Sequence, residues 1–247
     1  MSVEERKGRP RRIWAVLPTY NEAENVAPLV TALLSLPLDL HVVVVDDASP
    51  DGTADVAEGA GRGSARLEVI RREGERGLGT AYLAGFRRAA EAGAEAVLTM
   101  DCDFSHDPAA VPSLVAALDS ARVVIGSRYV AGGRIENWGL YRKALSAAAN
   151  RFVRALFRLP VSDCTSGFRL YRAEVLAAVP WERVSSTGYS FLVESLYWAM
   201  RGDGARVREV PICFLDRVRG QSKMGAREIL SGVVNLLRLR ADLFRRQ

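Results

Sequence analysis

The stretch Val97-Leu98-Thr99-Met100-Asp101-Cys102-Asp103-Phe104-Ser105-His106 decides the fold, and the rest of the chain is organised around it. An apolar run of strand length ends abruptly in two carboxylates, Asp101 and Asp103. Successive strand side chains point to opposite faces, but a turn just past the strand end can bring both carboxylates to one mouth. Hard oxygen ligands of this kind suit Mg²⁺ or Mn²⁺. Alternatively, the two aspartates are solvated turn residues, and Asp107 caps the next helix.

Apolar runs of similar length recur along the first half of the chain. They predict strands at residues 13–17, 40–45, 67–71, 96–100 and 122–125. Helical spacing or a capped helix start predicts helices at residues 26–36, from 53, at 80–92 and from 107. The run at 40–45 is rich in β-branched residues, which is typical of a strand buried on both faces. This alternation predicts an α/β fold, a Rossmann-like and mainly parallel sheet with helices on both faces.

Ligands of such sheets bind beyond the carboxyl ends of the strands. Several charged residues directly follow the expected strands, namely Asp46, Asp47, Asp101, Asp103 and Arg128. Because the carboxyl ends of parallel strands meet at one edge, we expect these side chains to lie close together. The sequence therefore predicts a binding site at this edge of the sheet.

The pattern changes after residue 130. We expect a long helix at 138–159, a polar turn at 163–169 that runs into a short strand, and a helix that carries Glu194. An extended segment at 206–214, interrupted by Pro211, precedes a basic glycine loop at 217–223. The expected domains are a disordered basic tail at 1–11, one folded domain at 12–225 and a basic amphipathic helix at 226–247. That last helix either lies on a membrane surface or packs on the core with a solvated basic face.

Composition narrows the class of protein. The 247 residues are 49% hydrophobic and carry a formal net charge of +5, which suits anionic partners such as phosphates or an acidic membrane surface. No nucleic-acid-binding module is recognisable. The three cysteines are scattered, which fits a reducing cytoplasm better than a disulfide framework. The charged start and the lack of a long apolar run predict neither a signal peptide nor a membrane-spanning helix.

Three motifs carry a resemblance to a known family: Pro18-Thr19-Tyr20-Asn21-Glu22, the segment Asp46-Asp47-Ala48-Ser49-Pro50-Asp51-Gly52-Thr53, and Asp101 to His106. In this order they resemble the family 2 inverting glycosyltransferases with the A-type nucleotide-sugar fold. Four more motifs, at 77–81, 126–129, 163–169 and 188–191, narrow the resemblance to polyprenol-phosphate (dolichol-phosphate) mannosyltransferases of a single-domain form without transmembrane helices. The resemblance covers residues 13 to 225.

The resemblance implies an activity and its partners. It implies transfer of mannose from GDP-mannose to the phosphate of a polyprenyl lipid, with Mg²⁺ or Mn²⁺ as cofactor. The enzyme would attach peripherally to the cytoplasmic face of a membrane, and a membrane-protein partner is compatible with this placement.

The resemblance also implies roles for individual residues. Asp101, Asp103 and Arg128 would be catalytic, and Asp103 and Ser105 would hold the metal. Arg142 and Ser146, one helical turn apart, would bind the acceptor phosphate. The nucleotide sugar would contact Pro18, Tyr20, Glu22, Val45, Asp47, Asp101, Cys102, Asp103, Arg128, Arg217 and Lys223. Alternatively, the arginines are solvated in an arginine-rich chain, and Asp47 caps a turn.

The chain supplies no obvious activated nucleophile. This fits a lipid phosphate acceptor, because a phosphate monoester has a second pKa of about 6 and is already anionic near neutral pH. Such a phosphate can attack the anomeric carbon without a protein base and invert it in one displacement. His106 is either a base or a residue of the helix start, and Glu194 either is structural or orients the sugar.

Other functions compete with this interpretation. UDP-glucose is the nearest rival donor, and a non-catalytic nucleotide-sugar-binding protein would carry the same motifs. A haloacid-dehalogenase-like phosphatase also uses Asp-x-Asp, but there the pair closes the first strand, whereas Asp101 closes the fourth. A nicotinamide-binding Rossmann protein needs Gly-x-Gly-x-x-Gly after the first strand, which this chain lacks.

Overall fold

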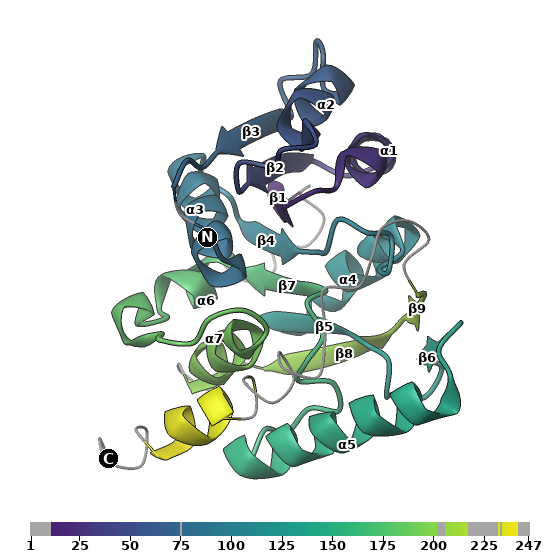
Figure 1. Ribbon diagram of the computed structural model, residues 1–247, viewed down its shortest axis with the longest axis vertical. Helices are drawn as coiled ribbons and strands as arrows, with labels where there is room; N and C mark the ends of the chain where they lie inside the picture. The colour runs from purple at the N-terminus through teal and green to yellow at the C-terminus, as the bar shows by residue number, and fades with distance from the viewer. Residues whose placement is uncertain (1–10, 75, 202–205, 217–231, 233, 242–247) are drawn as a thin grey trace.

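The computed structural model describes residues 11–74, 76–201, 206–216, 232 and 234–241. Its main sheet has seven strands in the order β3-β2-β1-β4-β7-β5-β8, and β6 and β9 form a second, two-stranded sheet (Figure 1). The strands are β1 Ile13–Thr19, β2 Leu40–Asp46, β3 Leu67–Arg71, β4 Ala96–Thr99, β5 Val123–Ser127, β6 Arg134–Ile135, β7 Arg169–Arg172, β8 Val207–Pro211 and β9 Cys213–Phe214. The apolar start of the stretch 97–106 therefore lies in the central strand, β4, and its carboxylates follow that strand.

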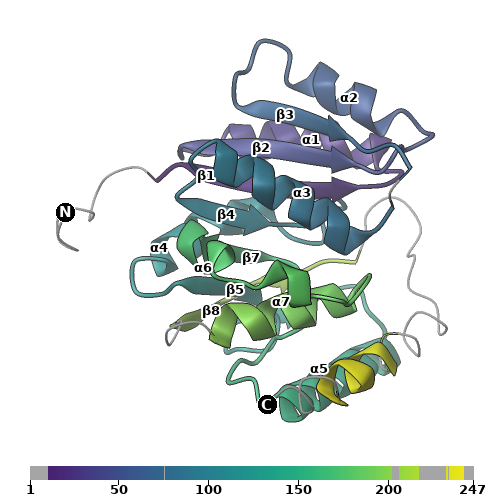
Figure 2. The same cartoon turned by 90° about the vertical axis from the view of Figure 1, so that its left-hand side faces the viewer.

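Helices lie on both faces of the main sheet, as predicted (Figure 2). They are α1 Ala23–Leu34, α2 Thr53–Ala60, α3 Leu78–Glu91, α4 Val111–Ala117, α5 Leu140–Phe157, α6 Ala173–Ala177 and α7 Ser190–Arg201, with 3-10 turns at Pro108–Ala110 and Trp181–Arg183. Alternate residues of β1 enter opposite layers: Leu17 packs with α1 and α4, while Val16 packs with α3 and α7. The sheet is buried on both faces because its central strands are apolar throughout.

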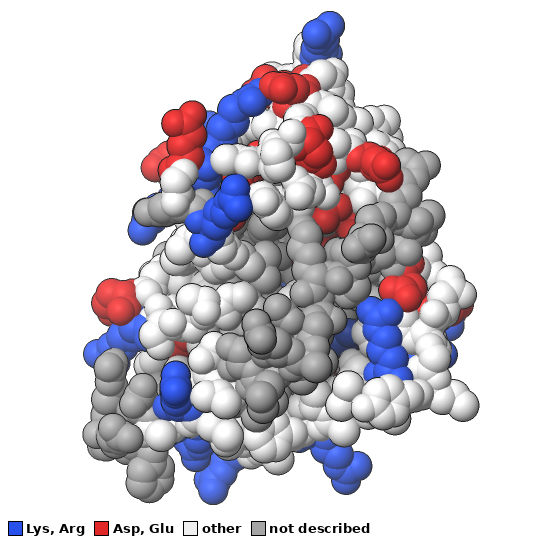
Figure 3. Space-filling view, in the orientation of Figure 1, with Lys and Arg blue, Asp and Glu red and all other residues white. Residues whose placement is uncertain are grey.

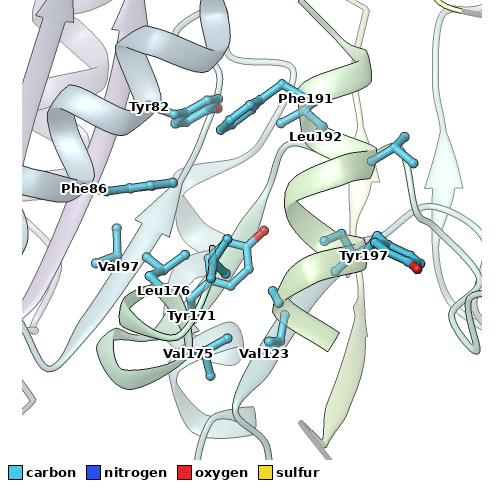
Figure 4. Close-up of a cluster of buried hydrophobic side chains, with 14 of the residues drawn as sticks. Tyr82, Phe86, Val97, Val123, Tyr171, Val175, Leu176, Phe191, Leu192 and Tyr197 are labelled. Atoms are coloured by element: carbon cyan, nitrogen blue, oxygen red, sulfur yellow. The ribbon is translucent and has the colours of Figure 1, made fainter. Parts of the chain in front are cut away.

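The layer between α3 and α7 is built on aromatic side chains (Figure 4). The rings of Tyr82 and Phe191 stack with centroids 6.0 Å apart, and the Phe86 ring also stacks on Tyr82, at 5.8 Å. A Cβ on Gly79 would come within 2.7 Å of the Phe191 ring, so only glycine permits this approach of the two helices. This packing fixes α7, and with it the segment that precedes α7, against the sheet.

Strand β7 is the feature of the sheet that the sequence did not place. It runs antiparallel between β4 and β5, whereas the other neighbouring pairs are parallel. Because β7 runs the opposite way, the turn before it lies at the edge where β4 and β5 end. Two hydrogen bonds fasten that turn there, from Thr99 Oγ1 to the Gly167 carbonyl (2.7 Å) and from Ser166 Oγ to the Gly126 carbonyl (2.8 Å).

The end of the chain is described only in part. Residues 232 and 234–241 are helical, and Leu236 and Leu239 are buried in the layer formed by α3 and α7. One side of this helix therefore packs on the core. The rest of the predicted helix at 226–247, and residues 1–10 of the predicted tail, lie outside the described residues. Within the part of the chain that the structure describes, no helix is both long and apolar enough to cross a bilayer.

Candidate active site

Three neighbouring loops at the carboxyl edge of the sheet each contain one residue with a strained backbone conformation. The loops after β1, β2 and β4 each place a non-glycine residue at positive φ: Asn21 at 57°, Ala48 at 50° and Phe104 at 57°. Each such residue costs on the order of 1–3 kcal/mol and persists only where the surrounding structure holds it in place. These loops are therefore fixed in shape at the edge where the sequence predicted a ligand.

The adjacent aspartates after β2 have different surroundings. Asp46 is buried and accepts hydrogen bonds from Thr19 Oγ1 (3.0 Å) and the Ser49 amide (2.9 Å), so it holds the first two loops together. Asp47 accepts from Arg72 Nε (2.7 Å) and from the Gly77 amide (2.8 Å). Asp47 thereby ties β2 to the loop before α3, and its predicted contact with a nucleoside stays a prediction.

Three other residues predicted to line the nucleoside site are partly accessible to solvent. Pro18, Tyr20 and Glu22 are half-buried, and the Arg76 guanidinium lies 4.8 Å from the centre of the Tyr20 ring. Glu22 Oε2 accepts a hydrogen bond from Asn25 at 2.9 Å.

Two of the residues predicted to contact the nucleotide sugar are buried. Val45 is 0% exposed and Cys102 is 3% exposed, and each packs in one of the two core layers. Burial raises the pKa of the Cys102 thiol well above its ordinary value, so this thiol stays protonated. Both residues lie beneath the polar edge, and their predicted contacts with the nucleotide sugar stay predictions.

The Asp-x-Asp turn presents oxygen atoms at the end of the central strand. The Asp101 side chain is 35% exposed, while Asp103 is 3% exposed and its Oδ1 accepts from the Ser105 amide at 3.0 Å. The Ser105 hydroxyl is buried and has no hydrogen-bond partner among the described residues. Two carboxylates and an unsatisfied hydroxyl in one turn fit a hard divalent cation, which prefers oxygen ligands.

His106 is enclosed behind this turn. Its ring stacks on Phe168 (5.1 Å between centroids) and meets the edge of Phe214 (5.4 Å). Burial lowers the pKa of His106 to about 4, although the Asp103 carboxylate acts in the opposite direction. The ring is therefore neutral at physiological pH, and its Nδ1 accepts from the Asp101 amide at 3.4 Å. This contact and the burial favour the helix-start interpretation of His106 over that of a base.

Arg128 forms a buried ion pair that the sequence did not predict. Its Nε and Nη2 donate to the two carboxylate oxygens of Asp163, both at 2.7 Å, and Nη2 also donates to Thr165 Oγ1 at 2.8 Å. The side chains are 8% and 0% exposed. Burial opposes ionisation, but the hydrogen bonds from Arg128 keep the pKa of Asp163 below its ordinary value. A donor phosphate at Arg128 would therefore meet an arginine that is already paired.

The residues predicted to bind the acceptor lie on the first turns of α5. Arg142 Nη1 donates to both carboxylate oxygens of Asp216 (3.1 and 2.9 Å), and its guanidinium lies 4.0 Å from the Trp138 ring centre. Ser146 Oγ is 2.8 Å from the Tyr129 hydroxyl. The residue before Asp216 contacts the Asp-x-Asp turn, because the Leu215 amide donates to the Ser105 carbonyl at 3.2 Å.

Arg142, predicted to bind the acceptor, is thus linked to the Asp-x-Asp turn through Leu215 and Asp216, which follow β9. Arg217 and Lys223, the remaining predicted donor contacts, lie outside the described residues.

Sequence reasoning missed the roles of two contributors to this edge. Asp163 holds Arg128, and Gly167 lies so close to Asp101 that a Cβ would stand 3.4 Å from its Oδ1. Glu194 is 0% exposed, and its Oε2 accepts from the amides of Ser185 (3.1 Å) and Ser186 (2.7 Å), which favours the structural role. The motifs at 163–169 and 188–191 marked these regions, but only the antiparallel course of β7 assigns Asp163 and Gly167 to the edge.

Comparisons with known proteins show the family of the chain. Residues 14–179 match the family described as Glycosyl transferase family 2. The chain is 40% identical over 227 residues to an undecaprenyl-phosphate mannosyltransferase from Micrococcus luteus, over 92% of this chain and 93% of that protein. It is also 40% identical over 221 residues to a polyprenol monophosphomannose synthase from Mycolicibacterium smegmatis, over 89% of this chain and 83% of that one.

Solved structures show the same architecture. Glucosyl-3-phosphoglycerate synthase from Mycobacterium tuberculosis, in complex with Mn²⁺, UDP-glucose and phosphoglyceric acid, matches with a TM-score of 0.69. The match covers 93% of this chain and 79% of that chain at 22% identity, so it bears on the fold alone. The family match, the two relatives and the polar carboxyl edge of the sheet lead to one conclusion: the chain belongs to glycosyl transferase family 2 and is a glycosyltransferase with the A-type fold.

Proposed function

We propose that this glycosyltransferase moves mannose from GDP-mannose to the phosphate of a polyprenyl lipid and inverts the anomeric centre. The observation that carries the proposal is the group of oxygen atoms from Asp101, Asp103 and Ser105 at the end of the central strand. It occurs in a chain that is 40% identical, over most of its length, to two proteins named for mannose transfer to polyprenyl phosphates.

Asp103, Asp101 and Ser105 would hold Mg²⁺ or Mn²⁺ together with the donor diphosphate. When bound, the cation would supply Lewis-acid stabilisation of the charge that develops on the leaving GDP. His106 supports this turn from behind through its contact with the Asp101 amide. Gly167 adjoins Asp101, since a Cβ there would stand 3.4 Å from Oδ1, in ordinary van der Waals contact.

The acceptor phosphate would attack without help from a protein base. One of its oxygens forms the bond to the anomeric carbon while the bond from that carbon to GDP breaks, and GDP leaves with the electron pair. The phosphate is anionic near neutral pH, so no proton has to be removed first. Arg142 and Ser146 would hold it on the first turns of α5, beside the segment that contacts the Asp-x-Asp turn.

Because the proposed acceptor is a lipid, the enzyme would act at a membrane surface. The enzyme would attach peripherally to the cytoplasmic face, and a membrane-protein partner would fit that position. The segment 226–247, with its leucines and arginines, would contribute to attachment, since a basic amphipathic helix binds anionic interfaces.

Replacing Arg142 by alanine should raise the apparent KM for lipid phosphate about ten- to a hundredfold, because a charge-assisted hydrogen bond is worth about 1.5–3 kcal/mol. Nucleotide affinity should stay nearly unchanged. Titration calorimetry with the nucleotide, together with initial rates against the acceptor, separates the two effects. Arg62→Ala, which removes an exposed arginine after α2, serves as the control. If nucleotide binding weakens while the acceptor KM does not change, Arg142 belongs to the donor site.

A donor screen tests the proposal as a whole. GDP-mannose, UDP-glucose and UDP-N-acetylglucosamine are each offered with polyprenyl phosphate, with divalent metal or with chelator. We expect transfer from GDP-mannose and dependence on the metal. If transfer from UDP-glucose is faster, UDP-glucose and not GDP-mannose is the donor. Binding of a nucleotide sugar without turnover would support the non-catalytic alternative.

A further inference from the structure

Helix α5 exposes apolar side chains where a surface helix normally carries polar ones. Asn150, Val153 and Phe157 face the core, yet Leu140 is 86% exposed, Tyr141 82%, Leu145 40% and Phe152 41%. With 3.6 residues per turn, these exposed residues fall on one side of the helix, together with three alanines. We call this side the outward stripe: Leu140, Tyr141, Ala144, Leu145, Ala148, Phe152 and Ala155. A continuous apolar surface of this kind marks an interaction site.

The charges of α5 are all of one sign. The helix contains Arg142, Lys143, Arg151 and Arg154 and no acidic residue. Arg142 is paired with Asp216, but among the described residues Arg151 and Arg154 have no acidic partner. In the view of Figure 3 the charged side chains visible along the lower edge, where α5 runs in Figure 1, are basic. This end of the molecule therefore suits an anionic surface.

A cleft adjoins the outward stripe. It has a volume of about 770 Å³ and lies between α5, Tyr129 and residues 159–162. Arg151 and Arg154 line it, and so do Ala148 and Ala155, which also belong to the stripe. The cleft thus places two guanidinium groups, neither with an acidic partner in the described part of the chain, directly beside exposed apolar surface. Guanidinium groups match phosphate oxygens in a fork geometry, so the combination fits a molecule with a phosphate at the boundary of an apolar phase.

We propose that this cleft binds the phosphodiester headgroup of an anionic phospholipid while the outward stripe lies in the acyl region of the same bilayer. The inference rests on the proposed lipid acceptor and goes beyond it, since it names a second lipid that is bound but not consumed. Arg142 and Ser146 lie on the first turns of the same helix, so docking of α5 would bring them to the depth of the acceptor phosphate.

The helical residues 234–241 extend the same surface. They lie beside α5 in both Figure 1 and Figure 2, and Val234 (37%) and Leu237 (47%) are exposed there. The described part of this segment carries Arg238 and Arg240 and no acidic residue. Two basic helices with outward apolar residues therefore share one end of the molecule, as expected for attachment to a membrane interface.

The first experiment measures binding of the full chain to vesicles of phosphatidylcholine with or without phosphatidylglycerol. Each basic residue near an anionic surface contributes to the free energy of membrane binding. Removal of two such residues should therefore weaken binding to phosphatidylglycerol vesicles about ten- to thirtyfold. We expect this for the double variant Arg151→Gln with Arg154→Gln, and little change on pure phosphatidylcholine. The matched control, Arg62→Gln with Arg87→Gln, removes the same charge from exposed positions outside α5 and should lose far less. Equal loss by both pairs, or no loss by the cleft variant, would overturn the proposal.

Two further arms separate the lipid from a free anion. A short-chain, water-soluble phosphatidylglycerol should compete for vesicle binding by the parent at concentrations where inorganic phosphate does not; equal competition would leave only an anion site and overturn the proposal. The double variant Leu140→Ser with Tyr141→Ser should weaken binding to both kinds of vesicle. If this variant binds like the parent, the outward stripe does not enter the bilayer and the proposal is overturned. Thermal melting checks that each variant is folded.

Activity on a short, water-soluble prenyl phosphate keeps this inference apart from the proposed function. The Arg151 and Arg154 variant should retain that activity, because the Asp-x-Asp turn and Arg142 are unchanged. If the parent itself fails to use the soluble acceptor, the proposed function fails, while the vesicle result still decides the lipid site.

Discussion

Asp103→Ala is expected to abolish transfer and to weaken metal-dependent binding of the donor. Asp103 lies buried in the turn after the central strand, next to the unsatisfied Ser105 hydroxyl. A metal ion contributes several kcal/mol of stabilisation to developing charge, so loss of a direct ligand should reduce turnover about a thousandfold or more. The measurements are single-turnover rates and donor affinity over a range of Mg²⁺ and Mn²⁺ concentrations.

Asp107→Ala is the matched control for this prediction. It removes a carboxylate from the same loop, but Asp107 is exposed and caps a 3-10 turn by accepting from the Ala109 amide at 2.9 Å. Loss of a cap costs about 0.5–2 kcal/mol of stability and should leave catalysis intact. Normal turnover of Asp103→Ala at saturating metal would remove the assignment of Asp103 as a ligand.

Asp163→Ala should destabilise the fold by about 3–5 kcal/mol, because it leaves the Arg128 guanidinium buried without a counter-charge. The pair is bidentate at 2.7 Å, and the Arg128 amide also donates to Asp163 at 3.1 Å. Denaturant unfolding of parent and variant measures the free energy of unfolding. Asp55→Ala is the control, because it breaks the exposed pair with Arg71 and should cost at most about 1 kcal/mol. If both variants lose a similar free energy of unfolding, the buried pair stabilises the fold no more than the exposed pair does.

The same pair predicts how stability depends on pH. The pKa of Asp163 lies below its ordinary value of 3.8 in the folded protein, so the unfolded chain takes up the proton first as pH falls. The contribution of this carboxylate is therefore fully present above the ordinary pKa and is lost as pH falls through the lower, folded value. Asp163→Ala should flatten the acid limb of the stability curve, and an unchanged limb would contradict this account.

Much of the fold could be predicted from the sequence because its strands are apolar and its helices periodic. The strand expected at 67–71 matches β3, and the central run ends at Thr99, one residue before the predicted end. The antiparallel course of β7 could not be predicted, because a strand of four residues without apolar–polar alternation carries no information about its partner or direction. Its position depends on the long excursion through α5, which returns the chain between β4 and β5.

The sequence predicted where the site lies, but it predicted only some of the contacts that its side chains make. Residues that directly follow the parallel strands gather at one edge, as the rule for such sheets requires. The partners of the predicted arginines come from remote positions: Asp163 is 35 residues from Arg128, and Asp216 is 74 residues from Arg142. Residue type and local spacing do not encode such pairs. Val45 and Cys102 were predicted as ligand contacts by resemblance; both are buried in the core layers, and their contacts with the donor stay predictions.

The central claim is an inverting transfer of mannose to a lipid phosphate. The most direct measurement is the anomeric configuration of the product, determined by NMR after incubation of the enzyme with GDP-mannose, a short prenyl phosphate and Mg²⁺. Because GDP-mannose carries an α linkage, we expect a single β-linked mannosyl phosphate, no product with chelator and none with Asp103→Ala. An α-linked product, release of free mannose in place of transfer, or full activity with chelator would contradict the account.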